Sequence, residues 1–238
     1  VLLFSVSFAG MAQAPYCDPN QTYSCYTYNM SINAVDILDG STSLYSRSHN
    51  VSGFGGCSAS TGYYTLWSTS SMFTLKSGNT YKMGFTTGVS YNVNIMIWID
   101  LNRDNDFADA NEFLTVPTCY YGSGNVAAGS TSLTYFNVKI PKGSPGVTRM
   151  RIRSSYYYTN CPSATDDACS NIPYGESEDY TITLQAANAN DASLSKLVTP
   201  QCGQTVNTTV TNYGSTDLTS VNLGWMVDGV AQTVNSYS

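Results

Sequence analysis

Two short segments hold most of the carboxylates of this chain. Residues 100–112 and 166–179 together carry ten of the 16 acidic residues: Asp100, Asp104, Asp106, Asp109 and Glu112 in the first, and Asp166, Asp167, Glu176, Glu178 and Asp179 in the second. Only 11% of all residues are charged, whereas about 25% is usual for a soluble domain. Because clustered carboxylates repel one another unless bases or a cation compensate, this placement indicates a binding site.

In the first segment, oxygen-bearing side chains alternate along the chain, at Asp100, Asn102, Asp104 and Asp106. Alternate positions of a tight loop can point toward one centre, and Ca²⁺ takes six to eight oxygen ligands. The loop resembles the EF-hand D-x-[DN]-x-[DN]-G pattern, although Asn105 stands in place of the turn glycine. Asparagine tolerates the positive φ of that position.

The acid that closes such a loop is Glu112, one position later than in the EF-hand. We therefore predict a calcium site with ligands from Asp100, Asn102, Asp104, Asp106 and Glu112. The alternative is an acidic surface turn stabilised by asparagine side chains. The apolar residues 94–99 before the loop indicate a strand, so the site would follow a strand and not a helix.

The second segment reads Gly-Glu-Ser-Glu-Asp-Tyr at residues 175–180 and leads into an apolar strand. Strand alternation places Glu176 and Glu178 on one face, and we predict that Glu178 also reaches the cation. The alternative is that these acids pair with Arg149, Arg151 and Arg153 on a neighbouring strand, and both can hold together.

Several kinds of chemistry are disfavoured. The single histidine, His49, leaves little room for histidine-based triads or zinc sites, and no nucleophile elbow, phosphate loop or HExxH motif occurs. A pI near 4.5 argues against nucleic-acid binding. A glycosidase using two of Glu112, Glu176 and Glu178 is the remaining enzymatic alternative, but we predict a protein that is not an enzyme.

The elements that must position these acids are short strands. Runs rich in β-formers, separated by turn residues, occupy residues 32–38, 63–67, 72–75, 80–86, 92–99, 132–140, 148–157 and 180–185. No segment has a sustained helical period. The predicted fold is all-β, an antiparallel, jelly-roll-like β-sandwich over residues 15–187.

A second β pattern follows a small, polar stretch at residues 186–191. Its expected strands are residues 192–198, 205–212 and 220–227, followed by a turn at Asp228-Gly229. We interpret residues 191–238 as part of an immunoglobulin-like domain.

The first 14 residues are uncharged, apolar and end in small residues, as in a signal peptide that lacks its basic start. The alternative is a buried strand. Export to the cell surface or medium would permit disulfides. Spacing suggests the pairs Cys17–Cys25, Cys161–Cys169 and Cys57–Cys119, with Cys202 left over; six cysteines allow 15 arrangements, and a zinc site is the rival interpretation.

Four features in this order resemble the GEVED domain over about residues 16–187. They are Tyr16-Cys17, the Trp98-Ile99-Asp100 loop, Arg149-Met150-Arg151 and residues 175–180, where Ser177 stands in place of valine. The resemblance implies a β-sandwich module of large secreted bacterial proteins, without established catalysis, that often accompanies peptidases, adhesion domains or a type IX secretion sorting domain. Residues 191–238 resemble CARDB-like cell-adhesion modules more weakly, through Cys202, residues 209–212 and Trp225.

These observations predict a non-catalytic, calcium-stabilised extracellular module for adhesion or for binding a glycan or other substrate. Its expected partners are an extracellular glycan or protein and other domains of the same full-length protein, with no nucleic acid and no membrane span. Several tyrosines that we expect to be exposed could stack on sugars, and the alternative is that they fill β-sheet faces. They are Tyr63, Tyr64, Tyr120, Tyr121 and Tyr156–Tyr158. The alternative function is that of an accessory domain of a secreted peptidase or glycosidase whose catalytic part lies outside the chain.

Overall fold

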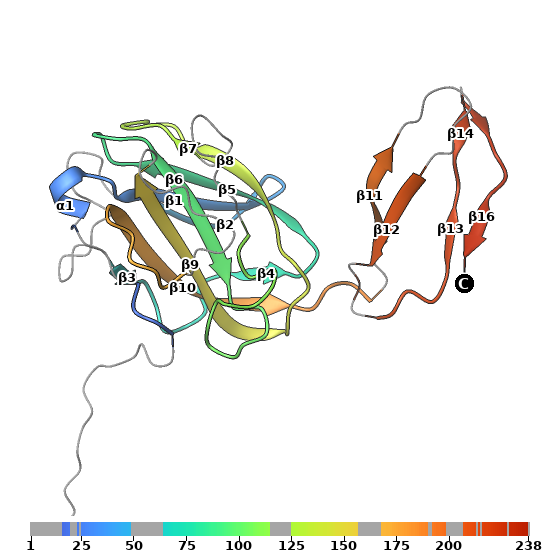
Figure 1. The fold of residues 1–238 in the computed structure, drawn as a ribbon, viewed down its shortest axis with the longest axis horizontal. Coiled ribbons are helices and arrows are strands. Elements are labelled where there is room, and N and C mark those ends of the chain that lie inside the picture. The colour runs from blue at the N-terminus through green and yellow to red at the C-terminus, as the bar shows by residue number, and fades with distance from the viewer. Residues whose placement is uncertain are drawn as a thin grey trace, which may run out of the picture. The chain divides into compact units, whose positions relative to one another are not determined.

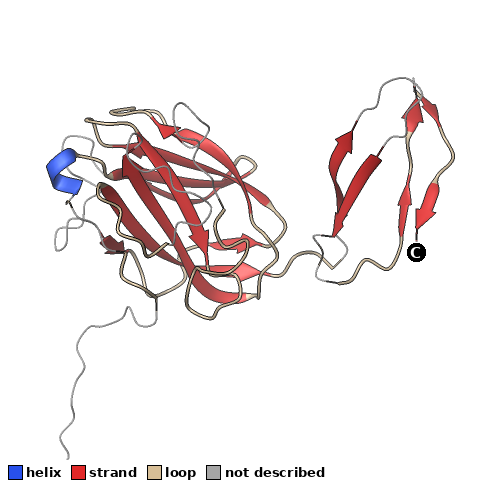
Figure 2. Cartoon of the chain, in the orientation of Figure 1, coloured by secondary structure: helices blue, strands red, loops and turns tan. Residues whose placement is uncertain are grey.

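The computed structural model describes residues 16–19, 23, 25–48, 64–114, 125–156, 168–189, 192–198, 207–212, 214, 216–227 and 229–237. The chain divides into two compact units, with the division after Gln185. Strands are the main regular structure in the described parts of both units, and the described part of the first unit adds only the single helical turn α1 (Cys25–Tyr28) (Figures 1 and 2).

One sheet of the first unit has four antiparallel strands. Their order is β2 (Thr42–Ser48), β1 (Ile32–Asp39), β5 (Thr80–Thr87) and β8 (Thr134–Lys139). β1 and β2 form a tight hairpin, in which Gly40 takes a φ of +60° that favours glycine.

The other sheet has six strands. Its main order is β3 (Tyr64–Leu66), β10 (Gly175–Gln185), β9 (Gly146–Tyr156), β6 (Val93–Ile99) and β7 (Asn125–Val126), and β4 (Thr74–Lys76) also pairs with β10. The pairs of β10 with β3 and β4 are parallel, whereas the other neighbours are antiparallel. β10 therefore lies inside the sheet, between β9 and two short strands.

The two sheets pack face to face over one apolar core, which confirms the predicted β-sandwich. The core takes alternate residues of the longer strands, such as Val35 and Ile37 from β1 and Ile95, Ile97 and Ile99 from β6. β6 is buried along its whole length, because its other face is also covered. There Met96 and Trp98 pack with Phe107, Ala168 and Ile172 in a second, smaller cluster.

All eight strands expected within residues 32–185 are present, with shifted ends. The largest shift is in β10, which starts at Gly175 and so includes the acidic motif that we expected to precede it. β2 was not predicted. Its sequence TSLYSRS is half-exposed and lacks an apolar alternation, so the hydrophobic pattern carries little signal there.

The described part of the second unit contains three antiparallel strand pairs. β11 (Ala192–Val198) pairs with β12 (Asn207–Asn212), β13 (Val221–Leu223) with β16 (Asn235–Tyr237), and β14 (Met226–Val227) with β15 (Val230–Ala231). Its kinship with CARDB-like modules stays a prediction. Among the described residues of the chain, no helix has the length and apolarity needed to cross a membrane.

Candidate metal centre and the buried acidic motif

The acidic loop, residues 100–112, leaves the end of β6 and returns alongside it. The amide of Ile99 donates to the carbonyl of Glu112 (3.0 Å), and the amide of Leu114 donates to the carbonyl of Ile97 (2.8 Å). The amide of Asp100 donates to the carbonyl of Arg149 (3.1 Å). Both ends of the loop are thus fixed to the six-stranded sheet.

Local side-chain hydrogen bonds give the loop its curvature. The side-chain oxygens of Asn102, Asp104 and Asp106 each accept a bond from the amide two residues ahead, at 2.8–3.2 Å, the geometry of Asx turns. Arg103, Asn105 and Asn111 take positive φ angles of 66–78°. The positive φ expected for Asn105 is therefore confirmed.

Three exposed carboxylates converge on the outside of this loop. One oxygen from each of Asp104, Asp106 and Asp109 lies within 4.8 Å of the others. The Asn102 amide nitrogen donates to Asp104 (2.9 Å) and to Asp109 (2.5 Å), which places that side chain at the same cluster. The structure thus brings together three of the predicted ligands and adds Asp109.

No base pairs with these three acids within the part of the chain that the structure describes. Arg103, the nearest base in sequence, lies instead against Gly146, where an added Cβ would clash with its guanidinium. Hard carboxylate oxygens without a counter-charge are the donor set that Ca²⁺ prefers. The residues present therefore fit a calcium ion.

Asp100 and Glu112 have a different environment, because both are buried. Asp100 accepts bonds from the amides of Arg103 and Asn105 and, at 2.6 Å, from the Tyr16 hydroxyl. Glu112 accepts from the amides of Leu101 (2.7 Å) and Asp109 (3.3 Å). Their contacts with the loop backbone place them beneath the exposed cluster, as the groups that shape it.

Burial raises the pKa of Glu112 to about 7. The negative charges of Asp100 and Asp109 act in the same direction, while the two backbone donors oppose them. A cation at the exposed cluster would offset this repulsion, because its charge would favour the ionised form of every carboxylate nearby.

Glu178 is not placed in this cluster. Its carboxylate points between the two sheets, where both oxygens lie 2.6 Å from Nη2 of Arg47 on β2. The Tyr180 hydroxyl donates to it at 2.6 Å. Burial of Arg47 opposes the charge of its guanidinium, but Glu178 and Tyr180 favour that charge and raise the pKa of Arg47. The guanidinium also lies 4.2 Å from the centre of the Trp67 ring.

Glu176 lies on the same face of β10 and is fully buried. Its Oε2 accepts a bond from the amide of Ile32 at 2.7 Å, which ties β10 to the start of β1. Burial, followed by the nearby charge of Glu178, raises the pKa of Glu176 well above its ordinary value. We therefore assign the proton of this coupled pair to Glu176 and the charge to Glu178.

The arginines of β9 pair with the opposite face of β10. Arg151 makes a two-point contact with Asp179, at 2.7 and 2.9 Å, and Arg149 contacts the same carboxylate at 3.3 Å. Arg153 donates to the Ser177 hydroxyl at 2.9 Å. The alternative, in which the β9 arginines pair with Glu176 and Glu178, is wrong, because strand alternation turns those two acids toward the other sheet.

A covalent link covers this outer face. Cys17 and Cys169 form a disulfide, so the predicted pairs Cys17–Cys25 and Cys161–Cys169 are both wrong. The bridge holds two segments over Arg151, which donates to the carbonyls of Cys17 (2.9 Å) and Ala168 (3.2 Å). The error arose because spacing favours local loops, whereas this bridge depends on which segments cover the sheet.

The other cysteines are only partly described. Cys25 also takes part in a disulfide, and its bond is not to Cys17. Cys57, Cys119, Cys161 and Cys202 lie outside the described residues, as do Asp166, Asp167 and the expected signal peptide. The Cys57–Cys119 pair stays a prediction.

Tyr16, next to the bridge, connects it to the acidic loop. Besides donating to Asp100, its ring lies 5.1 Å from the Phe107 ring of the loop and 4.9 Å from the Arg149 guanidinium. Sequence reasoning singled out Tyr16 only through family resemblance, and it missed Arg47 entirely. Asp109 was noted as an acid, but it was not chosen as a ligand because it falls outside the alternate spacing.

The positive φ of Asn105 yields a first testable prediction. Asn105→Gly is expected to leave the free energy of unfolding unchanged or slightly higher, because glycine adopts this φ without strain. Asn105→Val is expected to lower it by about 1–3 kcal/mol, because a β-branched residue is strained there. Urea denaturation of the two variants measures the difference, and equal stabilities would contradict the assigned backbone.

The chain was compared with curated proteins and with protein families. No match is found among the curated proteins. The family model of the GEVED domain matches residues 94–183, a range that begins in β6, includes the acidic loop and β9, and ends in β10. The sandwich strands that carry the acidic loop and the buried acidic motif therefore lie in the stretch that is similar to the GEVED domain.

Proposed function

We propose that this chain is a non-catalytic accessory module of a secreted or cell-surface protein. Ca²⁺ binds at the acidic loop and stabilises the module. The module serves adhesion or the binding of an extracellular ligand. The observation that carries the proposal is the convergence of Asp104, Asp106 and Asp109 without a base. The match to a small accessory-type domain supports the same assignment.

The burial of the glutamates supports a non-catalytic role. Glu112, Glu176 and Glu178 are each at most 1% exposed, and each accepts hydrogen bonds from groups of the chain itself. A glycosidase needs two carboxylates that reach a sugar from opposite sides. These three glutamates are instead held as internal contacts of the sandwich.

The disulfide supports export. Disulfides persist in oxidising compartments and are rare in the cytosol of most organisms. The Cys17–Cys169 bridge joins residues 152 positions apart, and Cys25 takes part in another. A module with this cross-linking is suited to the cell exterior, where millimolar Ca²⁺ is also available.

Calcium is expected to raise the melting temperature of the protein. Extracellular calcium modules bind with Kd of about 10⁻⁴–10⁻³ M, and a tenfold excess over Kd adds about 1.4 kcal/mol to the free energy of unfolding. For a chain of this length, that corresponds to a rise of about 3–6 °C. Thermal melts followed by circular dichroism, in calcium and in chelator, measure it.

The matched variants are Asp104→Asn with Asp106→Asn, and Asp39→Asn. The double variant is expected to lose the calcium response, because two of the three converging carboxylates are removed. Asp39 is an exposed acid at the end of β1, away from the loop, so Asp39→Asn is expected to keep the response. Equal melting temperatures of the native chain with calcium and with chelator would refute calcium binding.

A further inference from the structure

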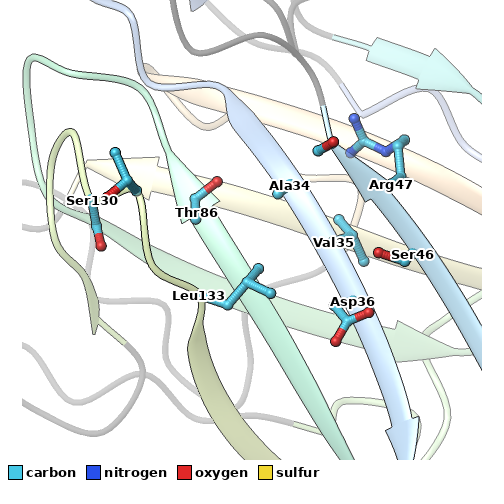
Figure 3. A pocket seen from close by; sticks show the side chains of 10 residues that line it. Ala34, Val35, Asp36, Ser46, Arg47, Thr86, Ser130 and Leu133 are labelled. Carbon is cyan, nitrogen blue, oxygen red and sulfur yellow. The ribbon is translucent and has the colours of Figure 1, made fainter. Parts of the chain in front are cut away.

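A hollow of about 350 Å³ lies on the four-stranded sheet (Figure 3). The acidic loop, in contrast, follows a strand of the six-stranded sheet. Residues from β1, β2 and β5 line it together with the segment that precedes β8. They are Ala34, Val35, Asp36, Ser46, Arg47, Ser48, Thr86, Ser130, Thr131 and Leu133. Its size is within the range of small-molecule sites.

The register of the strands explains the hollow. One cross-strand row joins Ser48, Ala34 and Thr86, and the next joins Ser46, Asp36, Gly84 and Tyr135. Ala34 contributes almost no side chain to the middle of the first row. The floor of the hollow is therefore low at Ala34, while hydroxyl-bearing side chains surround it.

Gly84 also permits the position of Tyr135. A Cβ on Gly84 would lie 2.5 Å from Cε1 of Tyr135, so the tyrosine ring lies flat across β5. The Tyr135 hydroxyl then reaches β1 and donates to Oδ2 of Asp36 at 2.7 Å. Tyr135 remains 42% exposed, and its hydroxyl contact with the lining residue Asp36 places the ring at the border of the hollow.

Asp36 is unusual for the outer face of a sheet, because it is only 8% exposed and no base pairs with it among the described residues. A carboxylate offers about four acceptor positions, and the Tyr135 hydroxyl uses one. A nearly buried acceptor with spare capacity, at the edge of a hollow, is suited to hydroxyl donors from a ligand.

We infer that this hollow binds a neutral saccharide unit, with Asp36 accepting two ligand hydroxyls and the Tyr135 ring packing against the apolar face of the sugar. This inference deepens the proposed binding function by naming a ligand class and a site. Hydroxyls of Ser46, Ser48, Thr86 and Thr131 both donate and accept, which matches the vicinal hydroxyls of a sugar. A simple amine would use only the carboxylate, and an acidic sugar would be repelled by it.

Two of the tyrosines first considered for sugar stacking, Tyr64 and Tyr156, are not suited to that role, and the others lie outside the described residues. Tyr64 donates to Asp179 at 3.1 Å, and Tyr156 packs against Tyr91 and Tyr174. Both are half-buried parts of the sandwich, in agreement with the alternative that they fill β-sheet faces. Tyr135, which was not singled out from the sequence, is the exposed ring next to a polar hollow.

The test is a titration of the ¹⁵N-labelled chain, in calcium, with glucose, galactose, mannose, N-acetylglucosamine and glucuronate, followed by amide chemical shifts. A ligand of hexose size is expected to bind with millimolar Kd. At least one of the four neutral sugars is expected to shift the amides of Ala34, Thr86 and Leu133, whereas glucuronate is not. Absence of shifts with every sugar, or shifts confined to other parts of the chain, would overturn the inference.

Three variants sharpen this test. Ala34→Leu fills the floor without removing a polar group and is expected to abolish binding, while Asp36→Asn is expected to raise Kd about tenfold by loss of charge-assisted hydrogen bonds. Asp39→Asn, on the same strand but outside the hollow, is expected to bind as the native chain does. Undiminished binding by Ala34→Leu would overturn the site.

The same spectra separate this inference from the proposed calcium function. Calcium titration is expected to shift amides of residues 100–112, the loop that follows β6 of the other sheet. A calcium response without a sugar response removes only the saccharide site, and a sugar response without a calcium response removes only the metal site. The calcium response of Ala34→Leu and Asp36→Asn also reports that these variants are folded.

Discussion

Glu178→Gln is expected to lower the free energy of unfolding by about 3–5 kcal/mol, whereas Glu176→Gln is expected to change it by less than about 1 kcal/mol. The two substitutions are chemically identical and lie two residues apart on the same buried face of β10. The expected effects differ because only Glu178 forms an ion pair with the buried Arg47.

Removal of the Glu178 charge leaves the Arg47 guanidinium buried between the sheets without its ion-pair partner. The penalty of an uncompensated buried charge is the reason for the large loss. Glutamine at position 176 keeps both useful contacts: its carbonyl oxygen accepts from the Ile32 amide, as Oε2 does now, and its amide donates to Glu178, as a protonated Glu176 would. Urea denaturation at pH 5, close to the ordinary pKa of a glutamate, measures both values.

The pH dependence of stability gives an independent check of the proton on Glu176. Its pKa is raised in the folded state, so the folded chain retains a proton that the unfolded chain loses above its ordinary pKa of 4.5. This contribution to stability is complete below that pH, and it is lost as pH rises through the folded pKa. Relative to Glu176→Gln, the native chain is expected to lose up to about 1.4 kcal/mol per pH unit.

A reversed result would contradict the charge assignment. If Glu176→Gln proved the more damaging change, then Glu176 would be the charged member of the pair. If the difference in stability between the native chain and Glu176→Gln were constant from pH 5 to 8, the pKa of Glu176 would not be raised.

The second large effect is expected from the disulfide. Replacing Cys17 and Cys169 by alanine releases a constraint between residues 152 positions apart, for which chain entropy gives a loss of about 5 kcal/mol, and measured values are usually about 2–5 kcal/mol. The loss is expected to include weaker calcium binding, because the bridge fixes the residue next to Tyr16, whose hydroxyl holds Asp100.

Tyr16→Phe is the matched control, because it keeps the bridge and the ring contacts but removes the hydrogen bond to Asp100. It is expected to lower the free energy of unfolding by only about 1 kcal/mol while still weakening calcium binding. Calorimetric titration and urea denaturation of both variants measure the two quantities. Calcium affinity unaltered in both variants would show that Tyr16 does not support the loop.

The strands could be predicted because each has its own signal within the sequence. The apolar residues of β6 and the alternation of β9 indicate strands without reference to any partner. The curvature of the acidic loop was likewise predictable, since asparagine at position 105 tolerates positive φ.

The partners of the buried charges could not be predicted in this way. Arg47 lies in a strand with little apolar alternation, and its pairing with Glu178 depends on how two sheets stack. The Cys17–Cys169 bridge likewise depends on which segments cover the outer face of β9. Asp109 joins the acidic cluster through the fold of the whole loop, so its spacing alone did not mark it as a ligand.

The alternating contacts of β10 have a consequence for the fidelity of folding. In the native register, Glu178 faces Arg47 and Asp179 faces Arg151. Sliding the strand by one residue in one direction would present Ser177 to Arg47, and sliding it in the other would present Tyr180 to Arg151. Either misalignment leaves a buried arginine without an acid, at a penalty of several kcal/mol. The Gly-Glu-Ser-Glu-Asp-Tyr sequence therefore helps to specify the register of β10. Both arginines have an acidic partner only in the native register, and each one-residue shift leaves one of them without an acid.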